Sequence, residues 1–332
     1  TEKDRGDDGE FGEEWGDVIE LEEENWYFRL SEHAEWLQTA VGEGPLGILP
    51  EFRRAEVMNA IERASETDLC ISRPKDRLHW GIELPFDPDF ITYVWFDALI
   101  NYISFAGYRS DQSSSLPDFE TLWPANAHVI GKDILVPAHA IYWPCMLHAM
   151  GFKDDKMPLL LVHGWWNIRR NALGSDTDSG EEKMSKSLGN VVDPAKLCER
   201  FGVDAVRYYL VRDIITGKDS AFDPDRLISL FNSELANDLG NLLNRSLNMT
   251  KRFVGGELAL LNYDDDACEE VRASLENTLG EYRSAMDDFD LTGALKAINS
   301  HVVHCNQFIE KNPPFELRKD ETQAQRVSAI LY

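Results

Sequence analysis

The sequence predicts a mixed α/β region with a parallel sheet, followed by a region made only of helices. Two observations carry this prediction. Short apolar runs alternate with helical patterns over the first two thirds of the chain, and every apolar pattern after Asp223 has helical spacing. Buried strands that alternate with helices are typical of a parallel sheet covered on both faces. The runs are Tyr93–Phe96, Ala127–Ile130 and Leu159–Gly164.

Helical patterns separate these runs and follow them. They predict helices over Trp26–Leu37, Arg53–Ala64, Ala98–Ala106, His139–Met150, Pro194–Arg200 and Asp204–Arg212. Beyond Asp223-Pro224, apolar side chains recur every fourth residue, which predicts one buried helical stripe. The stripe consists of Leu227, Phe231, Leu235, Leu239, Leu243 and Leu247, widened by Leu230 and Leu242. Two further helices are expected over Cys268–Met286 and Leu291–Ile309.

The composition sets limits on the kind of protein. The chain has 332 residues and a net charge of −26, and 43% of its residues are hydrophobic, which is enough for a sizeable core. A dozen of the first 25 residues are acidic. This charge repels nucleic acid at long range, so a nucleic-acid partner needs a locally basic or neutral surface. No apolar stretch approaches the roughly 20 residues of a membrane helix, so no membrane partner is expected.

The five cysteines are scattered and form no CxxC pair. This pattern argues against a disulfide scaffold and against a structural zinc site in this chain, so no metal ligands are predicted. It fits a reducing compartment, and we expect a cytoplasmic protein.

Two of the predicted strands end in residues suited to binding a ligand. Gly131-Lys132-Asp133 follows the second run, and His163-Gly164-Trp165 closes the third. Parallel sheets bind ligands beyond the carboxyl ends of their strands, so this edge is a candidate site.

Lys183-Met184-Ser185-Lys186-Ser187 is the sharpest chemical signal in the chain. Two lysines three residues apart, with hydroxyl groups between them, suit a triphosphate whose negative charge grows during transfer. A loop that closes on this charge near the transition state uses its binding energy where it raises the rate.

This segment resembles the KMSKS signature of class I aminoacyl-tRNA synthetases, and the surrounding chain resembles the methionyl-tRNA synthetase family from about residue 24 to residue 320. The segments that carry the resemblance are Glu24–Ser31, Asp68–Arg73, Tyr93–Ala98, His128–Asp133, Phe201–Tyr208 and Asn237–Arg245. The family's HIGH motif and its zinc knuckle do not occur in the sequence. The resemblance therefore implies a partial chain that lacks the first nucleotide-binding half and is inactive alone.

The resemblance also implies a domain organisation. Residues 1–90 would form the end of the connective insertion, with an acidic start. Residues 91–222 would form the second half of a Rossmann-like catalytic domain that carries the KMSKS loop. Residues 223–332 would form a truncated, all-helical anticodon-binding domain.

The family's methionine pocket falls on an aromatic cluster. A thioether packs well against aromatic faces. The implied pocket residues are Trp95, Ala98, Tyr102, Ile134 and His139, although one extra residue separates His139 from Asp133. Arg73 is expected to clamp a carboxylate or a phosphate with its fork of donors.

For ATP, the resemblance implies contacts from the two strand ends and from the signature loop. These residues are Gly131, Asp133, His163, Gly164, Lys183, Met184, Ser185, Lys186 and Ser187. Gly131 would let the ribose approach the backbone, and the Asp133 carboxylate would accept hydrogen bonds from the ribose hydroxyl groups. Lys183 and Lys186 are the expected catalytic residues, meeting the departing pyrophosphate while Mg²⁺ binds the phosphates.

A polar stripe in the helical region contains several asparagines, which are poor helix formers and so require a reason. Asn241 and Arg245 lie four residues apart and project together. Both can bond to unstacked bases, and the family's anticodon pair falls on them. Phe315 aligns with the family's anticodon-stacking tryptophan.

The resulting hypothesis is ATP-dependent activation of methionine to methionyl-adenylate and its transfer to tRNA(Met), within an intact protein. Two alternatives stay open from the sequence. The first is a non-catalytic tRNA-binding fragment. The second is another class I synthetase, for valine, isoleucine or leucine.

Overall fold

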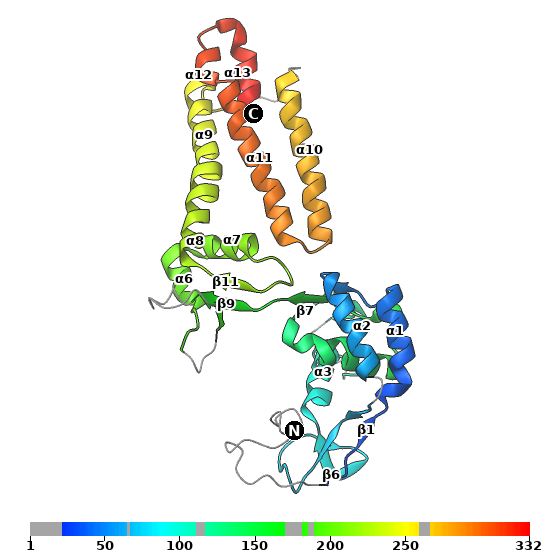
Figure 1. The fold of residues 1–332 in the computed structure, drawn as a ribbon. Helices are drawn as coiled ribbons and strands as arrows, with labels where there is room; N and C mark the ends of the chain where they lie inside the picture. Colours follow the sequence, from blue (N-terminus) through cyan, green and yellow to red (C-terminus); the bar gives the residue numbers. More distant parts are fainter. Residues whose placement is uncertain (1–21, 65–66, 111–116, 170–180, 185–188, 259–265) are drawn as a thin grey trace. The chain divides into compact units, whose positions relative to one another are not determined.

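The computed structural model describes residues 22–64, 67–110, 117–169, 181–184, 189–258 and 266–332 (Figure 1). The chain divides into two compact units, and each is described by itself. The first unit draws on Thr1–Ala40, Asn59–Pro124 and Pro137–Met157, and the second on Val41–Met58, Ala125–Val136 and Pro158–Tyr332.

The first unit combines small antiparallel sheets with helices. Strand β1 (Tyr27–Phe28) pairs with β3 (Leu69–Cys70), and β6 (Asp87–Thr92) pairs with β4 (Ser72–Pro74) on one side and β5 (Glu83–Leu84) on the other. Its helical elements are the 3-10 turn Leu30–His33, most of α1 (Ala34–Glu43), the end of α2 (Phe52–Ala64), α3 (Val94–Phe105), α4 (Phe119–Leu122), most of the π-type helix η5 (Leu135–Tyr142), α5 (Trp143–Ala149) and the 3-10 turn Asp154–Lys156.

The second unit contains the predicted parallel sheet. Strand β8 (Leu160–His163) pairs in parallel with β2 (Ile48–Leu49) and with β7 (His128–Gly131), and the 3-10 turn Lys132–Ile134 follows β7. A second sheet has β9 (Trp166–Arg169) between β10 (Glu181–Lys183) and β11 (Ser220–Phe222). Helices α6 (Pro194–Phe201) and α7 (Val203–Asp213) precede β11.

In the described residues after β11, the regular elements are all helices. They are α8 (Pro224–Leu230), the π-type helix η8 (Phe231–Gly240), α9 (Asn241–Val254), α10 (Asp266–Asp287), α11 (Leu291–Lys311), α12 (Pro314–Leu317), the 3-10 turn Glu321–Gln323 and α13 (Ala324–Leu331). Figure 1 shows α9, α10 and α11 as long helices of one bundle, with α12 and α13 at one end. The Asp223 carboxylate accepts hydrogen bonds from the backbone N–H groups of Asp225 and Arg226. The helical region therefore begins with an aspartate N-cap followed by Pro224 at the first helical position.

Two predictions of secondary structure are wrong. Tyr93–Phe96 is not a strand, because Tyr93 is the extended residue that precedes α3 and Val94 begins the helix. The helix predicted over Trp26–Leu37 begins as strand β1 and becomes α-helical at Ala34. In both places aromatic residues pack equally well in either conformation, so tertiary contacts decide.

The single leucine stripe is also wrong. Leu227 and Leu230 are buried, whereas Leu239, Leu243 and Leu247 are exposed. The π-type helix η8 lies between the two groups. Because a π-type turn holds more residues than an α-turn, a four-residue repeat does not stay on one face across it.

A polar network ties three helices of the second unit together. Arg212 of α7 donates from Nε and Nη2 to the two carboxylate oxygens of Glu234 in η8, at 3.0 and 2.9 Å. The Tyr208 hydroxyl donates to the same carboxylate at 2.6 Å, and Asn299 of α11 donates to it at 3.1 Å. The pKa of Tyr208 is raised to about 12, mainly because the hydroxyl is buried and secondly because it bonds to the Glu234 carboxylate. The tyrosine is therefore a neutral donor at neutral pH.

We expect Glu234→Ala to lower the free energy of unfolding by about 2–4 kcal/mol, because Arg212 keeps its charge in a mostly buried place and loses both acceptors. Urea denaturation followed by circular dichroism measures the loss. Asp213→Ala is the matched control, since its ion pair with Arg226 is more exposed and is worth under about 1 kcal/mol. Equal losses in the two variants would contradict the role given to Glu234.

Candidate functional site

The carboxyl ends of β7 and β8 lie side by side, as the sequence predicts. The two strands are parallel, and Gly131 at the end of β7 is the register partner of His163 at the end of β8. Ile130 and Val162, one residue earlier on each strand, are buried. The sheet core therefore fixes this pair of strand ends, which carries four of the residues expected to contact ATP: Gly131, Asp133, His163 and Gly164.

Neither strand end has room for a side chain at its glycine. A Cβ on Gly131 would lie 2.6 Å from Oδ1 of Asp133 and 3.7 Å from Cε1 of His163. A Cβ on Gly164 would lie 2.1 Å from the carbonyl oxygen of Lys218. Glycine at these positions permits the close approach of the Asp133 carboxylate at Gly131 and of the Lys218 main chain at Gly164.

Sequence reasoning missed a charged group beside these strand ends. The Lys132 ammonium donates to Asp219 at 2.6 Å and lies 4.3 Å from the ring centre of Trp165. The Trp165 N–H donates to the other oxygen of Asp219 at 2.9 Å. The hydrogen bond from Lys132, followed by the one from Trp165, holds the pKa of the Asp219 carboxyl below its usual range. Asp219 lies 87 residues from Lys132 in the chain, so no local pattern signals this pair.

The signature segment begins as a strand anchored in the second sheet. Lys183 ends β10, and its backbone pairs with Asn167 of β9. Met184 packs against a buried cluster of Tyr209, Phe222, Leu227 and Leu230. This methionine thus fixes the start of the segment to the core. Ser185, Lys186 and Ser187 lie outside the described residues.

The residues expected to bind methionine converge around Tyr102 in the first unit. Trp95, Ala98 and Tyr102 share one face of α3 by their spacing, and all three are partly exposed. The Tyr102 hydroxyl and Nε2 of His139 are 2.7 Å apart, and His139 is buried. The ring centres of Tyr102 and Trp143 are 5.7 Å apart. Burial raises the pKa of Tyr102, so its hydroxyl stays protonated at neutral pH.

His139 lies in a distorted helix. Leu135–Tyr142 forms a π-type helix, and Val136 inside it has the extended angles φ −113° and ψ 130°. His139 on this helix lies within hydrogen-bond distance of Tyr102.

Two other residues expected at the methionine site, Arg73 and Ile134, are described by their own surroundings. The Arg73 guanidinium stacks 4.3 Å from the ring centre of Tyr93 and donates to the carbonyl of Ser72 at 2.7 Å. Ile134 is the last residue of the 3-10 turn after β7 and belongs to the second unit. Arg73 on β4 is therefore positioned by the ring of Tyr93 and by the backbone of Ser72.

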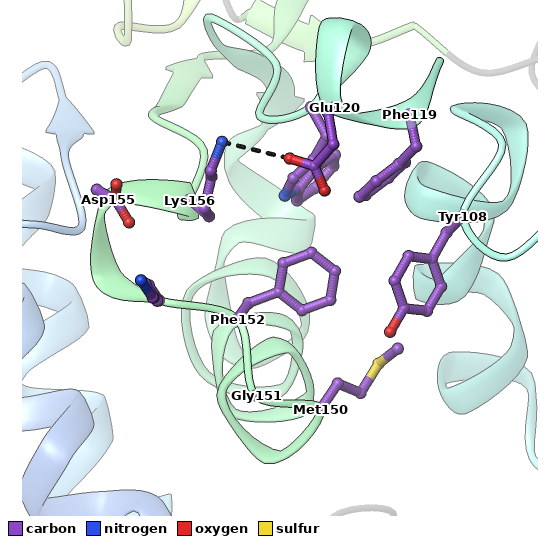
Figure 2. A pocket seen from close by; sticks show the side chains of 10 residues that line it. Tyr108, Phe119, Glu120, Met150, Gly151, Phe152, Asp155 and Lys156 are labelled. Atoms are coloured by element: carbon purple, nitrogen blue, oxygen red, sulfur yellow. Dashed lines mark ion pairs between the residues drawn. The ribbon is translucent and has the colours of Figure 1, made fainter.

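Figure 2 shows a cavity in the first unit, of about 320 Å³, lined by four aromatic and four charged residues together with Met150 and Gly151. Tyr108, Phe119 and Phe152 face one another across it, and Lys156 pairs with Glu120 at its rim, at 3.7 Å. The ring centre of Trp123, in the wall of this cavity, is 6.2 Å from that of Trp143, which in turn packs near Tyr102. None of the residues predicted to bind substrate lines this cavity, so we regard it as support behind the Tyr102 cluster.

The residues expected to read an anticodon lie in the helical bundle. Asn241 begins α9 and is exposed, and Arg245 one turn later is 3.6 Å from Glu310 of α11. Phe315 in α12 is 55% exposed, so its ring is open to stacking. The structure thus leaves Asn241 and Phe315 accessible and holds Arg245 with an acidic partner.

Within the described ranges, no group of three or more His, Cys, Asp or Glu side chains is arranged to hold a metal ion. In the same ranges, no helix combines the length and the apolar character that crossing a membrane requires.

A parallel strand pair with glycine at its ends, followed by a KMSKS-type segment and a helical bundle, defines the chain as a class I aminoacyl-tRNA synthetase protein. Residues 16–247 match the family described as tRNA synthetases class I (M). The chain belongs to this family, that of the methionyl-tRNA synthetases.

Individual relatives agree with this assignment. The methionine--tRNA ligase of Lactococcus lactis is 38% identical over 94% of the chain and 44% of its own length. That of Caldanaerobacter subterraneus is 38% identical over 95% of the chain and 46% of its own length. The chain thus spans less than half the length of these relatives. They favour the methionine family over the valine, isoleucine and leucine enzymes.

Solved structures of methionyl-tRNA synthetases are also similar to this chain. The crystal structure of Mycobacterium tuberculosis methionyl-tRNA synthetase bound by methionyl-adenylate is 36% identical and superposes with a TM-score of 0.80, covering 94% of this chain and 58% of that one. The apo form of the same enzyme is 33% identical, with a TM-score of 0.78 over 94% of this chain and 57% of that one.

We expect Tyr102 and His139 to stabilise each other. Tyr102→Phe removes the hydroxyl from a buried imidazole and should lower the free energy of unfolding by about 1–2 kcal/mol. His139→Gln should cost a similar amount. Their double variant should cost less than the sum of the two, with a coupling of about 1 kcal/mol. Urea denaturation of the four proteins measures the cycle, and additive losses would show that the hydrogen bond is not formed in solution.

Proposed function

We propose that this chain provides the methionine pocket, part of the ATP site and the anticodon-reading helices of a methionine–tRNA ligase. In the complete protein, the methionine carboxylate attacks the α-phosphate of ATP to give methionyl-adenylate and pyrophosphate. The methionyl group then passes to the terminal ribose of tRNA(Met). The Tyr102–His139–Trp143 cluster is the observation that carries this proposal.

This cluster suits a methionine side chain for two reasons. A thioether gains from contact with aromatic edges and faces, which Trp95 and Tyr102 supply on one face of α3. The hydrogen bond between Tyr102 and His139 gives each of the two polar groups a protein partner, so neither depends on the substrate for its first hydrogen bond. A site with satisfied polar groups favours an apolar side chain over a polar one. The similar Mycobacterium tuberculosis structure contains methionyl-adenylate, which supports this substrate.

For ATP, we propose that the strand ends of β7 and β8 receive the nucleoside. Gly131 admits the ribose, Asp133 accepts from its hydroxyls, and His163-Gly164 lies beside the adenine. The exposed position of Asp133 just after β7 supports this role. No metal cage occurs among the described residues, so Mg²⁺ would arrive on the ATP phosphates, as it commonly does.

We propose that Lys183 and Lys186 meet the pyrophosphate as it departs. The reaction needs no protein nucleophile, so positioning and charge stabilisation carry the rate. The packing of Met184 in the core supports this role, since a fixed start lets the rest of the segment approach the phosphates reproducibly.

The five cysteines are all free thiols in the structure. Free thiols spread over both units fit a reducing compartment, and we propose the cytoplasm as the place of action.

Methionine-dependent ATP–pyrophosphate exchange tests the catalytic proposal. The chain alone should show little or no exchange. Placed in the Lactococcus lactis relative in exchange for the matching segment, it should support exchange, and Lys186→Ala should reduce the rate by roughly 10²–10³-fold. Lys196→Ala, at an exposed lysine of α6 nearby, is the control and should change the rate little. Exchange that is indifferent to Lys186→Ala would refute the role of this lysine.

Binding of anticodon stem-loops tests the RNA proposal on the chain itself. Asn241→Ala and Arg245→Ala should each weaken binding of a CAU stem-loop by about tenfold or more, because bonds to base edges are worth about 1–3 kcal/mol. Lys251→Ala, at an exposed lysine of the same helix, should weaken all stem-loops slightly and equally. Fluorescence anisotropy gives the affinities. Equal weakening of CAU and other loops by Asn241→Ala and Arg245→Ala would show contact with the RNA backbone alone.

A further inference from the structure

The first unit contains a second cavity, of about 350 Å³, whose lining differs in charge from the cavity of Figure 2. Its wall consists of Arg73, Arg77, Leu78, Trp80, Thr92, Tyr93 and Val94. Two of these side chains are cationic and none is acidic. The cavity of Figure 2 has two lysines and two acids, so its charges balance. Glu23, which does not line the cavity, pairs with Arg77, and the two arginines still outnumber this acid. In a chain of net charge −26, this local positive excess favours an anionic ligand.

The two arginines have donors available for such a ligand. Arg73 stacks on Tyr93 and donates to the carbonyl of Ser72 and the Sγ of Cys70, and it forms no ion pair within the described ranges. Arg77 is 59% exposed at its side chain and donates through Nη1 to Glu23. Each guanidinium has five N–H donors, so both can still bind a phosphate.

Aromatic surface at the same cavity is exposed to solvent. Trp80 is 78% exposed, and Val94 beside it is 59% exposed. An exposed tryptophan next to guanidinium groups is the arrangement that binds unpaired nucleotides, because the base stacks on the ring while the phosphate meets the cation. Bases inside a duplex are already stacked on one another and cannot use this surface.

We propose that this cavity holds an unpaired nucleotide from the 3′ end of tRNA, with its base on Trp80 and its phosphate on Arg77 and Arg73. The inference rests on the proposed function and adds a second RNA contact to it. The position along the chain supports the choice of the 3′ end. Tyr93 and Val94 line the cavity, and Trp95, the next residue, belongs to the proposed methionine pocket. The 3′-terminal ribose accepts the methionyl group, so the last nucleotides of the tRNA have to pass close to that pocket.

The test compares two RNA hairpins with the 332-residue chain at low salt, by fluorescence anisotropy. One hairpin carries an unpaired 3′ ACCA extension and the other ends blunt. The chain should prefer the extended hairpin, and Trp80→Ala should reduce this preference by about 5- to 100-fold, the range expected for loss of one base stack. Trp80→Phe keeps a stacking ring and should retain most of the preference. Arg77→Ala should weaken binding of the extended hairpin and lower its salt dependence by about one phosphate contact.

Phe105→Ala is the matched control, because Phe105 is 81% exposed in the same unit and does not line the cavity. It should leave the preference unchanged. Equal binding of the two hairpins, or a preference that survives Trp80→Ala, would overturn the proposal. Displacement of the extended hairpin by an equal concentration of AMP would overturn it too, because the site would then be one for mononucleotides. Binding of the CAU stem-loop should be unaffected by Trp80→Ala, so the failure of this proposal is distinguishable from that of anticodon reading.

Discussion

The parallel pairing of β7 with β8 is the constraint on which the proposed nucleotide site depends. Its register sets Gly131 opposite His163. Ile130 and Val162 anchor that register, because both are buried and a shift of one residue would turn one of them toward solvent. Ordinary hydrophobic burial thus determines which backbone atoms end the two strands. The chemistry of the edge then follows from the absence of a side chain at Gly131, which leaves the backbone and the Asp133 carboxylate accessible together.

A second constraint lies immediately beyond these strands. Gly164 is in van der Waals contact with the main chain of Lys218 and Asp219, with space for no Cβ. The contact is stabilised by Asp219, which accepts from Lys132 after β7 and from the N–H of Trp165 after β8. One carboxylate therefore links the ends of both strands to the segment that leads into β11. Because Lys132 is used in this way, it is not free to act as a general phosphate-binding cation.

The sequence was sufficient wherever the signal was local. Apolar runs predicted β7 and β8, helical spacing predicted α2, α6 and α7, and the glycines marked the strand ends. It failed where the same residues fit two conformations, as at Tyr93 before α3, and where helix geometry changed, as at the π-type helix η8 that shifts Leu239 out of the buried face. The contacts of Asp219 with Lys132 and Trp165 could not be predicted, because these residues are far from Asp219 in the sequence and meet only after folding. The hydrogen bond between Tyr102 and His139 could not be predicted either, because the two residues lie 37 positions apart in the chain.

The chain is strongly acidic, yet the proposed partner is RNA. The pairing of its arginines with acidic side chains can reconcile these two properties. Arg245 is near Glu310 and Arg77 is bonded to Glu23, so in the free protein these two cations face acidic side chains. Both acids lie on the same chain, and the exposed Glu310 can turn to solvent at little cost when an RNA group replaces it. Such pairing weakens the non-specific attraction between protein and nucleic acid, because this attraction depends on unpaired cations and on the long-range electrostatic field of the protein. Binding then requires an RNA group whose geometry competes with the carboxylate, such as a base edge at Arg245 or a stacked nucleotide at Trp80. For the proposed RNA partner, this arrangement would favour selectivity, because the general electrostatic contribution would be small and stacking and hydrogen bonding would decide which RNA is bound.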